Sequence, residues 1–597
     1  MSRHPEGSIH EEELLGKAYD ARLIRRLWRY VKPHRSLVGS SLVLMFVVSA
    51  VQLVQPYLIK IAIDDHIAQK RLDGLGSLAL LFMAALVAEF GLRFAQLYVL
   101  QRTGQNVVFD VRMHVFTHLQ RLPSSFFDRN PVGRLMTRLT SDVEALNEAF
   151  TSGLVMAMAD VVKLAGIVAI LIWMDWRLAL ITFAVLPPTI ATTWFFRIRV
   201  RRAYRKTRAM IARLNSFLQE NVSGMRIVQL FGREGATFDR FSSVNMEYRD
   251  AQLSAVRYDS VFSALAELVG SVTLAAIVWA GGWGILSGLV TFGTLVAFIE
   301  YSARFFQPVQ ELSQRYTTMQ AAMAAAERIF ALLDNEVSIR SPAKPHPIDG
   351  RLRGEIVFEN VTFGYKEGEP VLKDVSFTIR PGERVAVVGW TGSGKSTLIR
   401  LLARLYDVQQ GRILVDGVDI RDYELPRLRR SIGVVLQDHF LFAGSVRDNI
   451  SLGEPRVTIE TVRRAAAAVH ADRFIEALPA GYDEEVRERG SNFSVGEKQL
   501  LSFARAIAFD PAILVLDEAT ASVDPETERR IQQALGVLLR GRTSVIIAHR
   551  LAAIDGVDRI LVLHHGRLQE QGSHDELLQI EGGIYRTLHS LQVAAVQ

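Results

Sequence analysis

A glycine-rich stretch in the second half of the sequence carries its most specific chemistry. The stretch follows an apolar run at residues 385–388, precedes a predicted helix, and reads Gly389, Trp390, Thr391, Gly392, Ser393, Gly394, Lys395, Ser396, Thr397. Backbone amides in such a turn can surround phosphate groups, the lysine can reach the β- and γ-phosphate oxygens, and the serine after it can hold Mg²⁺. A pattern of this length can also arise by chance in a glycine-bearing loop. The stretch predicts ATP binding, and other residues strengthen that prediction.

Two acidic residues end another apolar run, at residues 513–516, and they are Asp517 and Glu518. An aspartate at a strand end can hold Mg²⁺ through water, and the glutamate beside it can orient and polarise the attacking water molecule. Two acids after a strand can also form a solvated turn. In a chain with a phosphate-binding loop, the pair predicts ATP hydrolysis with Glu518 as the catalytic carboxylate.

Three more residues stand where a nucleotide site needs polar or aromatic groups. Gln437 follows the apolar run 432–436 and can sense the γ-phosphate and Mg²⁺. His549 follows the run 545–548 and can donate a hydrogen bond to the γ-phosphate. Tyr365 lies ahead of the phosphate-loop strand, where its ring can stack on adenine. Each residue alone is more often structural, but the joint spacing of Gln437 and His549 from the loop favours a functional interpretation.

Composition indicates a membrane part and a soluble part in one chain. The 597 residues exceed a single compact domain, 49% are hydrophobic, and 22% are charged. The absence of cysteine excludes disulfides, thiolate zinc sites and a cysteine nucleophile. The net charge of +6 is modest and the arginines follow loops rather than a basic face, so we expect no nucleic-acid partner.

Six apolar segments are long enough to cross a bilayer core of about 30 Å. They lie at residues 37–59, 75–100, 150–173, 178–196, 261–286 and 291–309. The loops after the second and fourth segments are long, basic and helical in pattern, which places them and both termini in the cytosol. No cleavable signal peptide is visible, and the arginine-rich stretch before Pro33 predicts an amphipathic helix on the membrane surface, with an ordinary surface helix as the alternative.

The second half has a different pattern, in which short β-type runs alternate with helical stretches after a polar linker at residues 338–347. This pattern predicts a mainly parallel α/β P-loop ATPase domain. The expected fold is therefore multi-domain, an all-α six-helix transmembrane domain followed by that ATPase. The expected divisions are an N-terminal segment with an interfacial helix (1–36), the transmembrane domain (37–315), a linker (316–350) and the ATPase domain (351–597).

These motifs together resemble those of ABC exporter half-transporters of the multidrug and lipid-flippase type, along nearly the whole chain. The family's signature, normally LSGGQ, aligns with Phe493, Ser494, Val495, Gly496 and Glu497, and its D-loop aligns with residues 521–524. Residues 488–490 resemble the exporters' X-loop. Two coupling loops are also matched, the first by Phe126, Phe127, Asp128, Gly133, Arg138 and Asp142 and the second by Glu220, Gly224, Phe231 and Glu234.

The resemblance implies a dimer in which two nucleotide domains hold two ATP molecules head to tail. Each ATP lies between one chain's phosphate loop and the other's signature, so Ser494 and Gly496 would contact the partner's nucleotide. The implied catalytic group is Glu518 with His549 and Gln437, and the implied Mg²⁺ set is Ser396, Gln437 and Asp517. The family's activity is ATP-driven export by alternating access, here of an amphiphilic drug-like compound or lipid across a bacterial inner (plasma) membrane.

The signature departs from the family pattern at two positions. Val495 replaces a glycine that lets backbone amides approach phosphate closely, and Glu497 replaces a neutral glutamine with a negative charge. This chain's own Lys395, Glu518 and His549 are present. Such a split resembles one member of a heterodimer, and a homodimer that tolerates the change is the alternative.

Other functions are disfavoured by particular features. A soluble ABC-type ATPase of DNA repair or translation would lack the six spans, and a protease-bearing peptide exporter would need a catalytic cysteine. A non-transporting regulator on the same scaffold stays open, as does peptide cargo, because fold does not identify the cargo.

Ionisable residues inside the predicted spans form three close pairs of opposite sign. The pairs are Glu89 with Arg93, Asp160 with Lys163, and Glu300 with Arg304. Charges in a membrane are expected to face the bundle interior or a wet cavity. Alternatively, each pair neutralises itself on its own helix.

Overall fold

The computed structural model describes residues 20–184, 186–517, 525–548 and 556–596. Its contacts divide the chain into two compact units. The helical unit comprises Met1–Leu119 and Gly133–Asp334, and the α/β unit comprises Gln120–Val132 and Asn335–Gln597. The short segment Gln120–Val132 therefore packs with the α/β unit, although in sequence it lies between helices of the helical unit.

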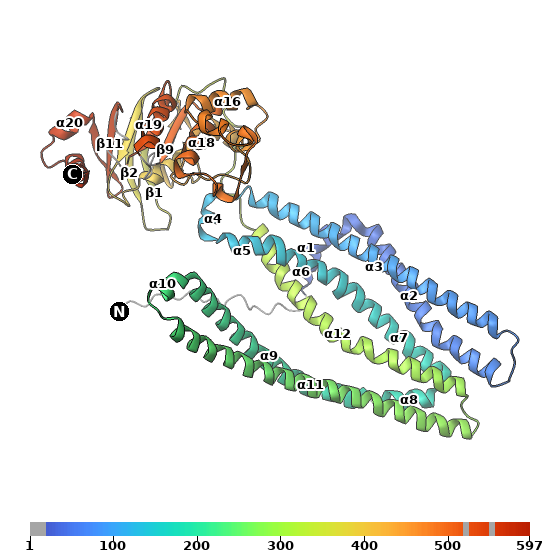
Figure 1. Ribbon diagram of the computed structural model, residues 1–597. Coiled ribbons are helices and arrows are strands. Elements are labelled where there is room, and N and C mark those ends of the chain that lie inside the picture. Colours follow the sequence, from blue (N-terminus) through green and yellow to red (C-terminus); the bar gives the residue numbers. More distant parts are fainter. Residues whose placement is uncertain (1–19, 185, 518–524, 549–555, 597) are drawn as a thin grey trace. The chain divides into compact units, whose positions relative to one another are not determined.

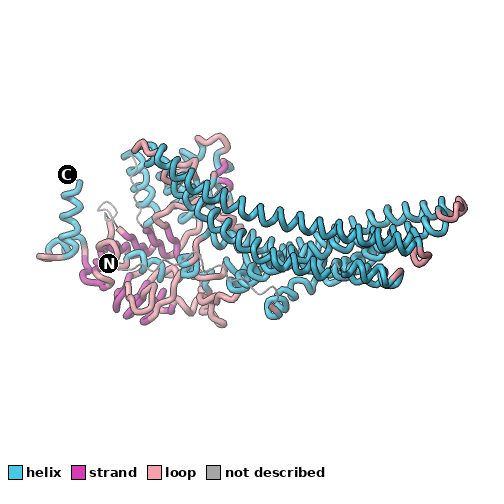
Figure 2. The backbone as a smooth tube through the Cα atoms, turned by 90° about the horizontal axis from the view of Figure 1, so that it is seen from below, coloured by secondary structure: helices cyan, strands magenta, loops and turns pink. Residues whose placement is uncertain are grey.

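Long helices build the helical unit because its apolar stretches are seldom interrupted by turn residues. They are α2 (Arg35–Ile61), α3 (Leu75–Leu119), α7 (Met156–Met174), α8 (Trp176–Ala184), α9 (Leu186–Ser223), α11 (Glu234–Leu286) and α12 (Phe292–Leu333). With 53 residues, α11 spans about 80 Å at 1.5 Å per residue, well beyond the bilayer core. Figure 1 shows α9 running alongside α11 and α2 alongside α3, and Figure 2 shows the long helices side by side from another direction.

Four helical stretches of the described residues are long and apolar enough to span a membrane. They are Ala21–Ile67, Leu75–Leu119, Val132–Met174 and Glu234–Leu286. They contain the expected first, second, third and fifth spans. The expected fourth span falls on α8 and the start of α9, on either side of residue 185, which lies outside the described residues. The expected sixth falls on α12, which carries Glu300 and Arg304 and continues to Leu333.

Local irregularities shape the helices. Pro56 lies inside α2 and Pro308 inside α12, where a proline removes a backbone donor. Three π-helical turns, η2 (Ala62–Ile67), η3 (Arg138–Asp142) and η4 (Ala149–Val155), interrupt the regular hydrogen bonding. The remaining short helices are α5 (Val132–Thr137), α6 (Val143–Glu148) and α10 (Met225–Leu230), together with α4 (Ser124–Arg129), which belongs to the α/β unit.

The arginine-rich N-terminal stretch forms the predicted helix, α1 (Ala21–Val31), followed by the 3₁₀ turn η1 (Lys32–His34). The Asp20 carboxylate caps its first turn by accepting a hydrogen bond from the amide of Arg22. Arg26 fastens the helix to the end of α12, since its guanidinium donates two hydrogen bonds of 2.7 Å to Asp334.

Two sheets organise the α/β unit. The six-stranded sheet has the order β12-β11-β3-β10-β9-β6, and every neighbouring pair in it is parallel except β12 with β11. Its strands are β3 (Arg384–Val388), β6 (Ile432–Val435), β9 (Ile513–Asp517), β10 (Thr543–Ile547), β11 (Arg559–His564) and β12 (Arg567–Gly572). The predicted mainly parallel α/β domain is thereby confirmed.

The second sheet is antiparallel, with the order β2-β1-β4-β5. Its strands are β1 (Ile356–Phe363), β2 (Leu372–Ile379), β4 (Gln410–Val415) and β5 (Val418–Asp419), and a short ribbon joins β7 (Gly444–Ser445) to β8 (Glu485–Val486). The helices of this unit are α13 (Lys395–Leu402), α14 (Leu425–Ser431), α15 (Val446–Ser451), α16 (Ile459–Ala468), α17 (Asp472–Glu476), α18 (Val495–Ala508), α19 (Pro525–Leu539), α20 (His574–Gln579) and α21 (Ile584–Val596), with 3₁₀ turns at η5 (Gly481–Asp483) and η6 (Glu488–Gly490).

Candidate nucleotide site and membrane cavity

The phosphate-binding loop connects β3 to α13, as its sequence predicts. Gly389, Gly392 and Gly394 have φ angles of +151°, +82° and +102°, a region that side chains rarely adopt. A Cβ atom on Gly389 would lie 2.2 Å from the Leu563 carbonyl oxygen. The loop thus needs glycine both for its conformation and for its close packing.

The polar groups of the loop suit a phosphate ligand. The buried ammonium group of Lys395 donates to the carbonyl oxygens of Gly389 and Trp390, at 2.8 and 3.1 Å. The Ser393 hydroxyl is buried and has no hydrogen-bond partner in the described part of the chain. Ser396 is exposed in the first turn of α13, where backbone amides favour an anion. Because these donors converge at a helix N-terminus, the loop fits a nucleotide phosphate.

Sheet register brings the other predicted groups to the same edge. Ile547 of β10 is paired with Val387 of β3 and with Asp517 of β9, so β3, β10 and β9 end at the same level. Val435, two residues before Gln437, is paired with Leu516. The phosphate-binding loop, Gln437 and Asp517 therefore all follow carboxyl ends of neighbouring parallel strands, where α/β sheets bind ligands. Glu518, His549 and the D-loop residues 521–524 lie outside the described residues.

Tyr365 is packed against protein groups. Its hydroxyl lies 3.1 Å from the Thr397 hydroxyl, and its ring meets the rings of Phe363 and Tyr406 edge-on, with centroids 5.2 and 5.3 Å away. The Arg400 guanidinium lies 5.7 Å from the ring centroid. Tyr365 is therefore held beside the phosphate-loop helix, and its stacking on adenine stays a prediction.

The first coupling loop contacts this aromatic cluster within the α/β unit. Asp128 of α4 accepts a hydrogen bond from the Tyr406 hydroxyl and lies 4.0 Å from a guanidinium nitrogen of Arg400. Arg129 donates to the backbone carbonyl of Tyr365 at 3.3 Å. Burial, and then the hydrogen bond to Asp128, raise the pKa of Tyr406, so its hydroxyl stays protonated as the donor. Neither Tyr406 nor Arg400 was predicted from the sequence, although Arg400 lies three residues after the phosphate-binding loop.

The signature segment forms the N-terminus of α18. Ser494 is the capping residue, and Glu497 completes a capping box, since the Ser494 amide donates to the Glu497 carboxylate at 2.8 Å. Val495 is 52% exposed and Gly496 is buried. A carboxylate of the chain itself therefore occupies the N-terminus of this helix.

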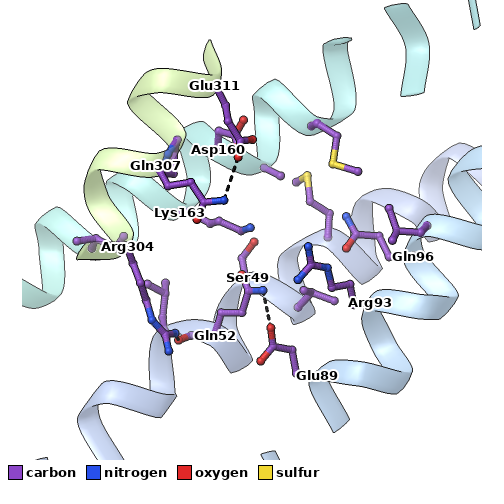
Figure 3. A pocket seen from close by; sticks show the side chains of 18 of the residues that line it. Ser49, Gln52, Glu89, Arg93, Gln96, Asp160, Lys163, Arg304, Gln307 and Glu311 are labelled. Carbon is purple, nitrogen blue, oxygen red and sulfur yellow. Dashed lines mark hydrogen bonds between the residues drawn. The ribbon is translucent and has the colours of Figure 1, made fainter. Parts of the chain in front are cut away.

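A cavity of about 400 Å³ lies in the helical unit among α2, α3, α7 and α12. Four cationic and three carboxylate side chains line it, which are Arg93, Lys163, Arg304 and Arg315 with Glu89, Asp160 and Glu311. Figure 3 shows Glu89 bonded to Gln52 and Glu311 bonded to Gln307. Five of the six charged residues in the predicted pairs thus line a common interior space, and Glu300 is not among them.

The alternative in which each pair neutralises itself is wrong for two of the three pairs. Glu89 accepts hydrogen bonds from Gln52 and Gln55, and Asp160 pairs with Arg315 of α12 at 2.7 Å rather than with Lys163. Only Glu300 and Arg304 come within ion-pairing distance of each other, at 4.0 Å. Arg304 also donates to the Gln52 carbonyl at 2.6 Å.

Several cavity residues were missed at the sequence level. Glu311 and Arg315 lie beyond the predicted end of the sixth span, and they pair with each other at 2.6 Å. Gln52 and Gln55 lie inside the first span, where paired amides in an apolar stretch were a usable signal.

The geometry defines an ATP-binding protein with a membrane-spanning half. Residues 38–309 match the family model of the ABC transporter transmembrane region, and residues 372–521 match the family model described as ABC transporter. The chain belongs to the ABC exporter half-transporters, and it is a multi-pass membrane protein that couples ATP hydrolysis to transport.

Relatives resemble the chain along nearly its whole length. An uncharacterised ABC transporter ATP-binding protein of Bacillus subtilis, YknV, is 40% identical over 97% of this chain and 96% of its own. An ATP-dependent lipid A-core flippase of Desulfotalea psychrophila is 35% identical over 96% of this chain and 99% of its own. A bacterial Atm1-family ABC exporter with ATP bound has a TM-score of 0.75 at 29% identity, over 94% of this chain and 98% of that one.

The contact between Asp128 and Tyr406 predicts a role in coupling. Tyr406→Phe keeps the ring contacts and removes a hydrogen bond to a charged, half-exposed group worth about 1 kcal/mol. We expect substrate stimulation of ATP hydrolysis to fall severalfold, while the nucleotide Kd stays within about twofold. Tyr482→Phe, away from α4, serves as the matched control. Full stimulation in Tyr406→Phe would contradict the prediction.

Proposed function

We propose that this chain exports an amphiphilic compound, drug-like or lipid, by alternating access as one half of a dimeric transporter. The observation that carries the proposal is the cavity of the helical unit, because it combines charged groups with apolar side chains inside a membrane domain. Similarity to a lipid A-core flippase supports a lipid-like cargo. The export cycle would use ATP binding to bring two ATPase units together and hydrolysis to release them.

The roles of the nucleotide-site residues follow from their positions. Lys395 and the amides of residues 389–394 would bind the phosphates, and Tyr365 would turn from Thr397 towards adenine. Glu518 would take the proton of the attacking water, with His549 holding the γ-phosphate and Gln437 sensing it. Ser396, Gln437 and Asp517 offer the oxygen donors that Mg²⁺ prefers, and the ion would neutralise phosphate charge when bound.

The proposed location is the plasma membrane, and the proposed orientation places the ATPase unit and both termini in the cytosol. Support comes from the charge of the loops. The connection through α9, α10 and α11 is rich in arginine, whereas the turn after α11 (residues 287–291) has no charged residue.

The partner proposed is a different half-transporter. Glu497 already bonds the N-terminal amide of α18, and Val495 projects a side chain where the family has glycine. Both features disfavour a γ-phosphate at this helix, since its positive end is partly neutralised and its approach is obstructed. A partner with an unaltered signature would then complete the site formed by this chain's Lys395 and Glu518.

Glu518→Gln tests the catalytic role. The amide preserves shape but cannot accept the proton of the attacking water, so turnover should fall by about 100-fold or more with nucleotide affinity nearly intact. ATP hydrolysis and equilibrium nucleotide binding in lipid nanodiscs measure the two effects. Glu528→Gln on α19 is the control. A Glu518→Gln variant that hydrolyses ATP near the parent rate would contradict the catalytic role of Glu518.

Introduced cysteines test the orientation, because the parent chain has none and gives no background. Ser77→Cys lies in the first turn of α3 and Ser243→Cys on α11, and both positions are exposed. In intact spheroplasts a membrane-impermeant maleimide should label Ser77→Cys. It should label Ser243→Cys only after permeabilisation. The reverse pattern would invert the proposed topology.

The double variant Val495→Gly with Glu497→Gln tests the partner proposal. If the chain alone is limited by its signature, this variant should raise ATP turnover of the homodimer by about tenfold or more. Native mass and turnover, measured in lipid for both forms, give the result. A parent homodimer that is stable and hydrolyses ATP briskly in a transport-coupled manner would refute the heterodimer.

A further inference from the structure

The carboxylates of the membrane cavity are already satisfied by the protein. Glu89 holds the amides of Gln52 and Gln55. Asp160 and Glu311 share the guanidinium of Arg315, with nitrogen to oxygen distances of 2.7 and 2.6 Å. These acids have little remaining capacity to attract a cationic ligand.

Two cations of the same cavity have no such partner. Among the residues that the structure describes, neither Arg93 of α3 nor Lys163 of α7 makes a hydrogen bond or lies within ion-pairing distance of an acid. Figure 3 shows both side chains directed into the pocket. Because a charge inside a membrane domain costs free energy unless it is paired, these two groups are suited to an anion supplied from outside the chain.

Apolar side chains make up a large share of the remaining lining, beside the polar Ser49, Gln96 and Gln307. The cavity is bordered by Met45, Val48, Leu53, Leu97, Met156 and Ile167. A volume of about 400 Å³ is in the range of small-molecule sites and accommodates a head group with the beginning of an apolar body. A free oxyanion would leave this apolar surface uncovered.

We infer that the cavity binds the anionic head group of an amphiphile, a phosphate or carboxylate, through Arg93 and Lys163. The inference rests on the proposed export function and names the substrate class. Arg304 and Arg315 are held by the protein and keep the field of the cavity positive. The apolar lining receives the adjoining part of the ligand.

Ligands that share one tail and differ in charge test the inference. Binding of radiolabelled dodecyl phosphate is measured on the assembled transporter in phosphatidylcholine nanodiscs, with dodecyltrimethylammonium and inorganic phosphate as competitors. The variants are Arg93→Gln, Lys163→Gln and their combination. Arg102→Gln, exposed on the same helix as Arg93, is the matched control, and Arg93→Lys with Lys163→Arg preserves the charges.

Each single neutralisation should raise the Kd for dodecyl phosphate about tenfold, and the double variant should raise it further. The control and charge-preserving variants should bind like the parent. Dodecyltrimethylammonium should compete poorly. Equal competition by the cationic compound, or unchanged binding in the double variant, would overturn the inference. If inorganic phosphate competes with the affinity of dodecyl phosphate, the claim that the ligand is an amphiphile is overturned, and a free oxyanion is indicated.

Nucleotide binding separates this inference from the proposed function. All variants should bind ATP with the parent's Kd, which shows that the protein is folded. A transporter that binds dodecyl phosphate through Arg93 and Lys163 but moves no compound would refute export alone. Active export with binding indifferent to both residues would refute the anion site alone.

Discussion

The alignment of parallel strand ends is the constraint on which the nucleotide site depends. Strands β3, β10 and β9 are paired so that Val387, Ile547 and Asp517 lie side by side, and β6 ends next to Leu516. Residues separated by more than a hundred positions in sequence follow these strand ends. A shift of one residue in the pairing of any two strands would move a functional group by the rise of one residue, about 3.3 Å. It would also turn the side chain to the other face of the sheet.

In the helical unit, the constraint is that charged side chains away from water need ion-pair or hydrogen-bond partners. Arg315 serves two acids at once, and Glu89 is held by amides from a neighbouring helix. These bonds join α2 to α3 and α7 to α12. The groups that keep charge in the cavity therefore also hold its walls together.

The sequence was most informative where the chemistry is local. Residues 389–397 predict their own conformation because the glycines, lysine and serine act within one loop, and the strand ending at Asp517 needs only an apolar run before an acid. Contacts between elements were less accessible. Opposite charges at helical spacing suggested self-pairing for Glu89 with Arg93, yet partners on other helices offered better geometry. The bond of Asp128 to Tyr406 depends on tertiary placement that no spacing encodes. The roles of Glu518 and His549 stay predictions.

Pro56 in α2 leaves a carbonyl oxygen beside the membrane cavity open to a hydrogen bond from another helix. Since proline has no amide hydrogen, the carbonyl of Gln52, four residues earlier, lacks the donor that a regular helix would supply. Arg304 of α12 donates to that oxygen. The hydrogen bond missing within α2 is thus replaced by one between helices, from the Arg304 side chain to the α2 main chain. Any motion that slides α2 along α12 must first break this hydrogen bond. The Gln52 carbonyl oxygen then needs another donor, such as a water molecule in the cavity.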